Sequence, residues 1–120
     1  MIKFKSLNQS SAFLKILKKK KLHTKYFTIF FDKNISQTSE TKYLNISFVM
    51  KKKIGNAVIR NKIKRKLKYA VQKIVIQKDI VDLSYTYVVF GKNNVYKDKF
   101  SDVLYQVNET FKKIRQMDNQ

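Results

Sequence analysis

The sequence contains no cysteine, no proline and no tryptophan, and it has a single histidine among 120 residues. Without cysteine there is no disulfide scaffold, no thiolate zinc site and no cysteine nucleophile. No apolar run approaches the roughly 20 residues that a membrane-spanning helix needs, and residues 1–11 lack the hydrophobic stretch of a secretory signal. We therefore expect a soluble, cytoplasmic protein in a reducing compartment, not associated with a membrane.

The composition supports a folded chain with one domain. Hydrophobic residues make up 43% of the sequence and aromatic residues 13%, which is enough to build a core. A chain of 120 residues has the usual length of one domain, so residues 1–120 are predicted to fold as a unit. We find no linker and no internal repeat.

The charge is unevenly distributed along the chain. The formal net charge is +19, and residues 1–78 hold 21 lysines and arginines against two acids. Residues 79–120 are balanced, with six of each. Between Lys51 and Lys78 there are eleven basic residues and no acid. An ordinary charge run is a solvated face, but this density without counter-charges indicates a polyanionic partner, with nucleic acid ahead of an anionic membrane.

Hydrophobic periodicity predicts six main elements. Helices are expected over residues 10–21, 56–77 and 97–115, and strands over residues 26–32, 43–50 and 83–91. The order α-β-β-α-β-α predicts an α+β fold, a single-domain sandwich. The short connection between the first two strands predicts that they run antiparallel. The helix that follows them acts as a crossover, which allows the second and third strands to lie parallel.

The helix predicted over residues 56–77 has two unlike faces. Five apolar residues fall on one stripe, namely Ile59, Ile63, Leu67, Ala70 and Ile74. Asn61, Arg65, Lys68 and Gln72 occupy the opposite side. We expect the apolar stripe to cover the sheet and the cationic side to face solvent or a partner.

Residues 51–68, KKKIGNAVIRNKIKRKLK, have the properties of a phosphate-binding segment. Gly55 permits a tight turn, Asn56 is a good N-cap, and the free N–H groups at a helix start favour anions. Asn61 can exchange hydrogen bonds with a sugar or a base edge. The candidate RNA-binding residues are Lys51, Lys52, Lys53, Asn56, Arg60, Asn61, Lys62, Lys64, Arg65 and Lys68.

The same segment resembles the signature of the bacterial ribonuclease P protein component, which is close to K-x-G-N-A-V-x-R-N-R-x-K-R-x-x-R. The matching residues are Lys53, Gly55, Asn56, Ala57, Val58, Arg60, Asn61, Lys64 and Arg65. Lys62 and Lys68 stand where the family usually has arginine, so charge is kept but bidentate phosphate geometry is lost. Lys51 stands where a small hydroxyl residue is common.

The resemblance implies an αβ sandwich similar to a ribosomal-protein domain, with a left-handed crossover that contains the basic helix. It implies a protein that binds the catalytic RNA of ribonuclease P and the 5′ leader of precursor tRNA. The RNA, with Mg²⁺ bound mainly to it, would cleave the leader. The protein alone would then catalyse nothing, no catalytic or metal-ligating residue is assigned to it, and no protein oligomer is expected.

A leader cleft between the first helix and the sheet is a further implication of the resemblance. Alternation along the first predicted strand puts Tyr26, Thr28 and Phe30 on one face, and Phe13, Leu17 and Phe30 match family cleft residues by position. The candidate cleft residues are therefore Phe13, Leu17, Tyr26, Thr28 and Phe30. Aromatic faces accept any base, although the pattern alone also allows Phe13 and Phe30 to be core residues.

The sequence gives weaker support to other functions. A basic ribosomal RNA-binding protein without a role in cleavage explains the charge and the helix, and a membrane-surface or cationic structural protein explains the charge. A metal nuclease acting alone lacks clustered carboxylates. His23, following a lysine run, is expected to be exposed or to contact RNA. The pairs Asp79/Asp82 and Asp98/Asp102 are expected to cap helices or complement their dipoles.

Overall fold

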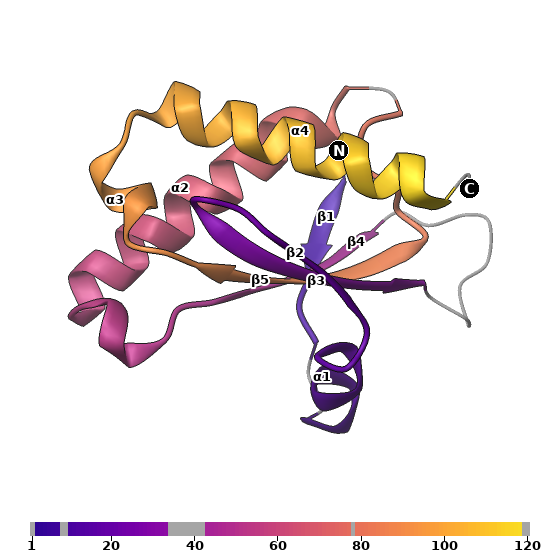
Figure 1. Cartoon of the computed structure of the whole chain (residues 1–120), viewed down its shortest axis with the longest axis horizontal. Helices are drawn as coiled ribbons and strands as arrows, with labels where there is room; N and C mark the ends of the chain where they lie inside the picture. The colour runs from indigo at the N-terminus through magenta and orange to yellow at the C-terminus, as the bar shows by residue number, and fades with distance from the viewer. Residues whose placement is uncertain (1, 8–9, 34–42, 78, 119–120) are drawn as a thin grey trace.

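The computed structural model describes residues 2–7, 10–33, 43–77 and 79–118. The strands are β1 (Lys3–Lys5), β2 (Lys20–His23), β3 (Phe27–Lys33), β4 (Tyr43–Val49) and β5 (Tyr85–Gly91). The helices are α1 (Ser10–Ile16), the 3-10 turn η1 (Lys52–Ile54), α2 (Ala57–Val75), α3 (Asn94–Lys97) and α4 (Phe100–Asp118). The long helices α2 and α4 lie on one side of the sheet, and α1 lies on the other (Figure 1).

The sheet has five strands in the order β1-β4-β5-β3-β2. As expected, β4 and β5 run parallel on either side of the α2 crossover. Strands β3 and β4 run antiparallel as expected, but they are not neighbours, because β5 lies between them, antiparallel to β3 and parallel to β4. Five of the seven residues of β5 are buried, and a strand covered on both faces belongs in the middle of a sheet. The left-handed sense of the crossover stays a prediction.

The main core lies between the sheet and the two long helices. The sheet contributes Phe27, Ile29, Phe31, Leu44, Ile46, Tyr87 and Val89, and α4 contributes Val103, Val107, Phe111 and Ile114. The predicted apolar stripe of α2 is confirmed: Ile63, Leu67, Ala70 and Ile74 are buried together with Val71, and Ile59 packs at the edge. The apolar face of α2 is therefore committed to the interior.

The N-terminal third differs from the sequence-based prediction. The helix expected over residues 10–21 ends at Ile16, and residues 20–23 form β2 at the edge of the sheet. Lys21 pairs with Phe30 and Leu22 with Ile29 in the β2–β3 register. The pairing satisfies backbone groups and separates lysines that would crowd one another in a helical turn.

Two further elements carry too little sequence pattern to be predicted. Strand β1 is three residues long and lies parallel to β4, and α3 is a four-residue helix before α4. The closing helix, predicted over residues 97–115, spans residues 100–118 instead. Within the described residues, no helix is long and apolar enough to cross a membrane.

Candidate nucleic-acid interface

The start of α2 is built as an anion-binding terminus. Asn56 caps the helix, its Oδ1 accepting a hydrogen bond from the Ile59 backbone N–H over 3.0 Å. Gly55 has φ of 157°, and a Cβ there would lie 3.2 Å from Cγ2 of Ile59, so this turn favours glycine. The first turn of α2 carries no acid, which leaves the positive end of the helix dipole open to an anion.

The structure exposes the cationic face of α2 as predicted. Of the ten candidate RNA-binding residues, nine are exposed: Lys51, Lys52, Lys53, Asn56, Asn61, Lys62, Lys64, Arg65 and Lys68. Within the described part of the chain, no acid forms an ion pair with Lys64, Arg65 or Lys68. The positive charges of these three side chains are therefore not neutralised by the described residues and are available to a binding partner.

Arg60 differs from its neighbours on α2. Its side chain is half-buried, and its Nε atom is shut away from solvent without a hydrogen-bond partner among the described residues. Lys66 is also withdrawn from the exposed face, because its ammonium donates to the backbone carbonyl of Asp98. The free cations of the helix are thus concentrated on one side.

The face of the sheet away from α2 and α4, here called the open face, carries an aromatic cluster. Phe30 of β3 and Phe90 of β5 lie 5.5 Å apart between ring centroids, edge to face, and Phe13 of α1 lies 6.4 Å from Phe90. Beneath α1, Ile16 and Val88 are buried. The three phenylalanine rings are only partly buried, so this cluster has a solvent-facing side.

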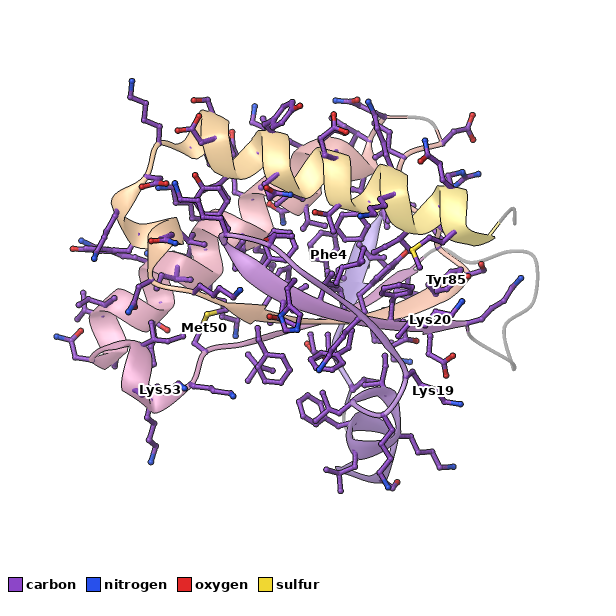
Figure 2. All side chains as sticks on the ribbon, viewed as in Figure 1. Phe4, Lys19, Lys20, Met50, Lys53 and Tyr85 are labelled. Atoms are coloured by element: carbon purple, nitrogen blue, oxygen red, sulfur yellow. The ribbon has the colours of Figure 1, made fainter. Side chains whose placement is uncertain are left out.

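Lysines flank the aromatic cluster. The ammonium of Lys21 lies 5.8 Å from the Phe30 centroid, and that of Lys51 lies 5.5 Å from the Phe90 centroid. Figure 2 shows Lys53 beside the start of α2 and Lys19 beside α1. The open face therefore combines ring surfaces with positive charge, the pairing that single-stranded nucleic acid uses.

A cavity connects the open face to the start of α2. Its volume is about 350 Å³, and it is lined by Thr28, Lys51, Lys53, Ile54, Phe90, Gly91, Lys92 and Asn93. The segment that leads into the cationic helix and Phe90 of the aromatic cluster therefore share one cavity, although they come from distant segments of the chain.

Four of the five candidate cleft residues lie where they were expected. Phe13 and Leu17 are half-buried in and just after α1, and Phe30 belongs to the aromatic cluster. Thr28 is nearly buried, and its hydroxyl lies 2.8 Å from Nδ1 of His23 on the neighbouring strand. Each is therefore placed on or beside the open face.

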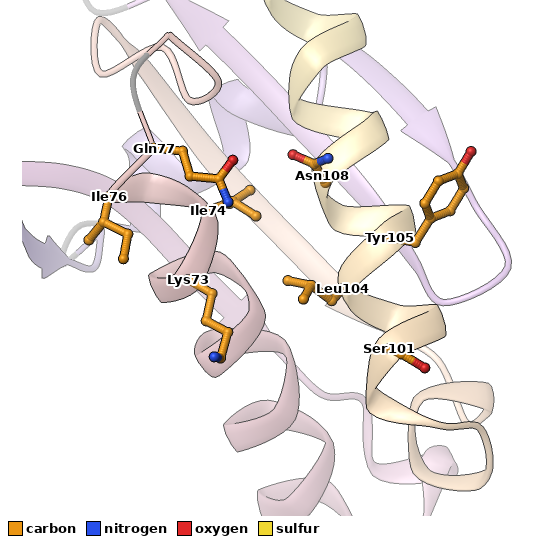
Figure 3. Close-up of a pocket in the computed structure, with 8 residues that line it drawn as sticks. All are labelled: Lys73, Ile74, Ile76, Gln77, Ser101, Leu104, Tyr105 and Asn108. Atoms are coloured by element: carbon orange, nitrogen blue, oxygen red, sulfur yellow. The ribbon is translucent and has the colours of Figure 1, made fainter.

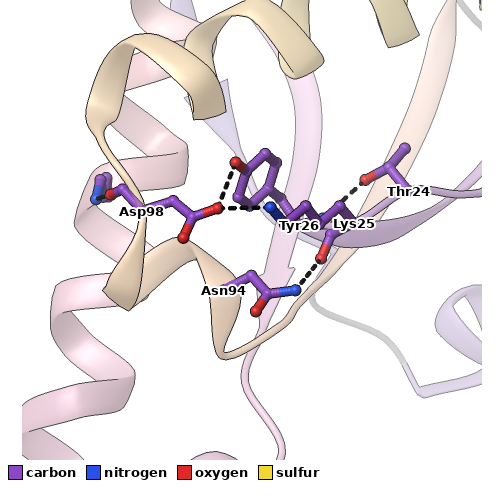
Figure 4. Close-up of polar contacts among 6 residues, drawn as sticks. Thr24, Lys25, Tyr26, Asn94 and Asp98 are labelled. Atoms are coloured by element: carbon purple, nitrogen blue, oxygen red, sulfur yellow. Dashed lines mark hydrogen bonds and ion pairs between the residues drawn. The ribbon is translucent and has the colours of Figure 1, made fainter.

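The expected placement of Tyr26 on the open face is wrong. Tyr26 precedes β3, so strand alternation does not govern it, and its ring joins the main core with 5% of its surface exposed. Its hydroxyl donates to Oδ2 of Asp98 over 2.7 Å, and the ammonium of Lys25 lies 3.0 Å from the same oxygen (Figure 4). The ring of Tyr26 therefore lies in the main core and not on the open face.

This network shifts the pKa values of its members. Hydrogen bonds from Tyr26 and Lys25 hold the pKa of the Asp98 carboxyl below its usual value. The hydrogen bond to Asp98 raises the pKa of the Tyr26 phenol and that of the Lys25 ammonium. The turn before β3 is thus tied to the segment between α3 and α4.

Sequence reasoning missed Phe90, Lys21 and His23 as neighbours of the candidate cleft. Phe90 could have been found, because alternation along β5 separates Val88 and Phe90 from Tyr87 and Val89. Lys21 and His23 could not have been found, because the sequence pattern placed neither of them in a strand. Their positions depend on β2, whose edge pairing has little local signal.

The described residues contain no group of three or more His, Cys, Asp or Glu side chains that could hold a metal ion. Asp98 is already engaged by the Tyr26 hydroxyl and the Lys25 ammonium.

Fold and site together define an α+β domain with a cationic helix beside an aromatic sheet face. The family model for ribonuclease P matches residues 1–115. The chain therefore belongs to the ribonuclease P protein family. As a member, it is the protein subunit of the endoribonuclease that processes the 5′ end of tRNA, and a ribosomal RNA-binding protein is not favoured.

Individual relatives agree with the family assignment. The chain is 28% identical over 106 residues to the ribonuclease P protein component of Mesoplasma florum, covering 88% of this chain and 90% of that protein. It is 31% identical over 84 residues to that of Carboxydothermus hydrogenoformans, covering 70% and 67%. The match to Mesoplasma florum extends over most of both chains, well beyond the motif.

Solved structures share the fold. The ribonuclease P protein of Thermotoga maritima superposes with a TM-score of 0.72 at 24% identity, covering 91% of this chain and 96% of that one. The protein of Staphylococcus aureus gives a TM-score of 0.66 at 20% identity, with 91% and 93% covered. At these identities the likeness supports the architecture alone.

Proposed function

We propose that the exposed side of α2 binds the catalytic RNA of ribonuclease P, and that the open face binds the 5′ leader of precursor tRNA. The whole of residues 1–120 would act as one RNA-binding domain, in the cytoplasm where its RNA partners are made. Cleavage would be performed by the RNA with Mg²⁺ bound mainly to it. The protein would hold substrate and RNA together.

The main support for this proposal is that the open face and the lysines before α2 are connected. The cavity that connects Phe90 and Thr28 with Lys51 and Lys53 joins the ring surfaces of the open face to the anion-binding start of α2. A strand of RNA that stacks on Phe30 and Phe90 can thus pass its phosphates to these lysines without leaving the protein. Stacking is tolerant of sequence, which suits leaders that differ from one tRNA to the next.

The contacts to the catalytic RNA would come from charge along α2. Lys62, Lys64, Arg65 and Lys68 are exposed over two turns, a spacing that follows a folded backbone better than a point ligand. Arginine can bind phosphate through two parallel hydrogen bonds, whereas lysine acts as a point charge. We therefore assign the directional contact to Arg65 and the general attraction to the lysines.

The deciding experiment is reconstitution of processing activity. The protein would be mixed with a bacterial ribonuclease P RNA at low Mg²⁺ and supplied with precursor tRNA carrying either a long or a one-nucleotide leader. We expect the protein to restore cleavage, and Lys21→Ala to slow cleavage of the long-leader substrate more than that of the short one. Lys112→Ala, an exposed lysine on α4, is the charge-matched control.

Two results would contradict the proposal. Cleavage by the protein in the absence of the RNA would contradict the subunit role. The second result is that Lys21→Ala and Lys112→Ala slow cleavage of the long-leader and short-leader substrates to the same extent. The lysines would then contribute only through net charge, and the leader would not bind to the open face.

A further inference from the structure

A line of side chains runs along the flank of α2 that faces α3 and the start of α4. Lys62, Lys66, Tyr69 and Lys73 follow one another at intervals of four, three and four residues, which places them on one side of a helix. At 1.5 Å per residue the line is about 16 Å long. Figure 1 shows α3 and the start of α4 beside α2, away from α1. The line is therefore separate from the proposed leader surface.

Two tyrosine rings along this line lie next to lysine ammonium groups. The ammonium of Lys62 is 5.9 Å from the ring centroid of Tyr96 on α3, and that of Lys73 is 5.2 Å from the ring centroid of Tyr69. Tyr69 also packs against Phe100, with 5.2 Å between the ring centroids. We call this surface the tyrosine–lysine strip, which comprises Lys62, Tyr69 and Lys73 of α2 and Tyr96 of α3.

Both rings of the strip are accessible and held in place. Tyr69 is 51% exposed and Tyr96 is 45% exposed. Tyr69 is braced by Phe100, and the ammonium of Lys66 donates to the backbone carbonyl of Asp98, two residues after Tyr96. This hydrogen bond ties the segment between α3 and α4 to α2. Because the rings are already ordered, a ligand that stacks on them loses little free energy in fixing them.

The charge around the strip favours an anionic ligand. Lys62 and Lys73 form no ion pair within the part of the chain that the structure describes. Lys97 and Lys99, between α3 and α4, are also exposed, and so is the acid Asp102 in the first turn of α4. Four lysines thus outnumber one exposed acid. Charge alone would suit any polyanion, but rings beside cations suit nucleotides, which carry a flat base beside a phosphate.

We propose that the tyrosine–lysine strip binds unpaired nucleotides of the catalytic RNA. Their bases stack on the rings of Tyr69 and Tyr96, and their phosphates pair with Lys62 and Lys73. An exposed contact between a lysine and a ring is weak, so each ammonium can turn to a phosphate. Bases within a duplex are already stacked, whereas unpaired bases are free to stack on a side chain.

The catalytic RNA is the partner because the strip adjoins the surface already assigned to it. Lys62 belongs both to the exposed side of α2 and to the strip, so an RNA that lies along α2 reaches Tyr96. The inference rests on the RNA-binding function proposed above. It adds stacked bases to the phosphate contacts of α2.

The first test measures binding of the full chain to a bacterial ribonuclease P RNA over a range of salt concentrations. Tyr96→Leu should weaken binding about tenfold, within the range for loss of one stacked base. The slope of log affinity against log salt concentration should not change, because stacking releases no counterion. Tyr96→Phe keeps the ring and should bind like the unaltered protein.

Tyr105→Leu is the matched control for this test. Tyr105 is exposed on α4, and Figure 3 shows its ring pointing away from α2, where Lys73 lies. No lysine ammonium lies over its ring among the residues that the structure describes. The affinity of Tyr105→Leu for the RNA should therefore equal that of the unaltered protein.

The second test locates the RNA on the protein surface. Tyrosines of the full chain are nitrated with tetranitromethane, with and without the same RNA, and the modified peptides are quantified by mass spectrometry. We expect the RNA to lower nitration of Tyr69 and Tyr96 several-fold and to leave nitration of Tyr105 unchanged.

Three results would overturn the inference. Nitration of Tyr69 and Tyr96 that the RNA leaves unchanged would show that it does not cover the strip. Equal loss of affinity in Tyr96→Phe and Tyr96→Leu would show that stacking on the ring is not the contact. Protection of both tyrosines that grows with protein concentration without RNA would make the strip an interface between copies.

The inference and the proposed function can fail separately. If Arg65→Ala weakens RNA binding while both tyrosines of the strip remain open to nitration, only the inference is wrong. If the RNA protects both tyrosines but the protein does not restore cleavage of precursor tRNA, only the proposed function is wrong.

Discussion

The hydroxyl of Tyr26 donates a hydrogen bond of 2.7 Å to Asp98, a residue 72 positions further along the chain. Lys25 adds an ion pair to the same carboxylate, and Asn94 donates to the Lys25 carbonyl over 3.1 Å (Figure 4). The turn that precedes β3 is thereby fixed to the α3–α4 segment. Because Phe30 lies on β3, this contact also helps to position the open face.

We predict that the Asp98 network makes stability depend on acid pH. The pKa of Asp98 lies below its ordinary value of 3.8, since Tyr26 and Lys25 favour the charged carboxylate. A lowered pKa contributes stability above the unfolded-state value, and that contribution is lost as the pH falls through the folded-state value. Asp98→Asn should therefore melt at a lower temperature than the unaltered protein at pH 7, and the difference should be smaller at an acid pH well below the ordinary value of 3.8.

Thermal melts followed by circular dichroism at both pH values test this prediction. Glu109→Gln is the control, because no ion pair of Glu109 is found among the described residues and its charge is not among those that act on Lys25, Tyr26 or Asp98. A difference between Asp98→Asn and the unaltered protein that is the same at both pH values would rule out the charge-dependent contribution.

The aromatic cluster of the open face should matter only for substrates with a leader. Phe30→Ala removes a ring that lies 5.5 Å from Phe90, and loss of one stacked base costs about 1–3 kcal/mol. We expect the affinity of the reconstituted enzyme for a long-leader precursor to fall by about tenfold or more, with little change for mature tRNA. Fluorescence anisotropy of labelled RNAs measures both.

A matched control separates stacking from loss of packing. Leu14→Ala, which truncates an apolar side chain of α1 that is 59% exposed, should leave leader binding unchanged. If Phe30→Ala weakens binding of long-leader and leaderless RNAs alike, or unfolds the protein, then Phe30 is a core residue.

Arg65 should contribute one measurable phosphate contact. It is exposed on α2, and no ion pair holds it within the described ranges. Each phosphate contact contributes roughly 0.7–0.9 to the slope of log affinity against log salt concentration. Arg65→Ala should therefore flatten the slope for the catalytic RNA by about that amount. An unchanged slope, with Lys112→Ala as reference, would mean that Arg65 faces solvent in the complex.

Gly91 is predicted to be intolerant of any side chain, for reasons of space. A Cβ at this position would lie 2.6 Å from Sδ of Met50 and 2.9 Å from Cγ2 of Ile63. Overpacking of this kind typically costs about 1–3 kcal/mol, so Gly91→Ala should lower the free energy of unfolding by about that amount. Chemical denaturation with urea measures it.

A double mutant tests whether crowding against Met50 causes the loss in the free energy of unfolding that is predicted for Gly91→Ala. Met50→Ala combined with Gly91→Ala should cost less than the sum of the two single changes, because the thioether no longer meets the new methyl group. Strict additivity would show that crowding against Met50 is not the cause.

Much of the candidate interface could be predicted because its signals are local. The two faces of α2 follow from a spacing of 3.6 residues per turn, and Asn56 was expected to cap the helix because side chains of its type accept the first free N–H groups. The motif that resembles the ribonuclease P family lies within this one segment. Hence Asn61, Lys64 and Arg65 were placed on the exposed side correctly before any fold was known.

Errors occurred where a pairing partner, rather than the segment's own pattern, decides the structure. Strand β2 exists because it pairs with β3, and Tyr26 turns inward because Asp98 accepts its hydroxyl proton in a hydrogen bond. Neither partner is visible in the local pattern. The position of β5 between β3 and β4 likewise depends on covering both faces of one strand, which is a property of the whole sheet.

By itself, then, the sequence determined a cationic amphipathic helix with an anion-binding start, because helix periodicity, capping and charge act over a few neighbouring residues. Only the tertiary structure brought Phe13, Phe30 and Phe90 together on the open face, next to the cavity that Lys51 and Lys53 line before α2. Those arrangements depend on the order of strands and on the packing of α2 against α4, in which contacts between distant segments outweigh local preference.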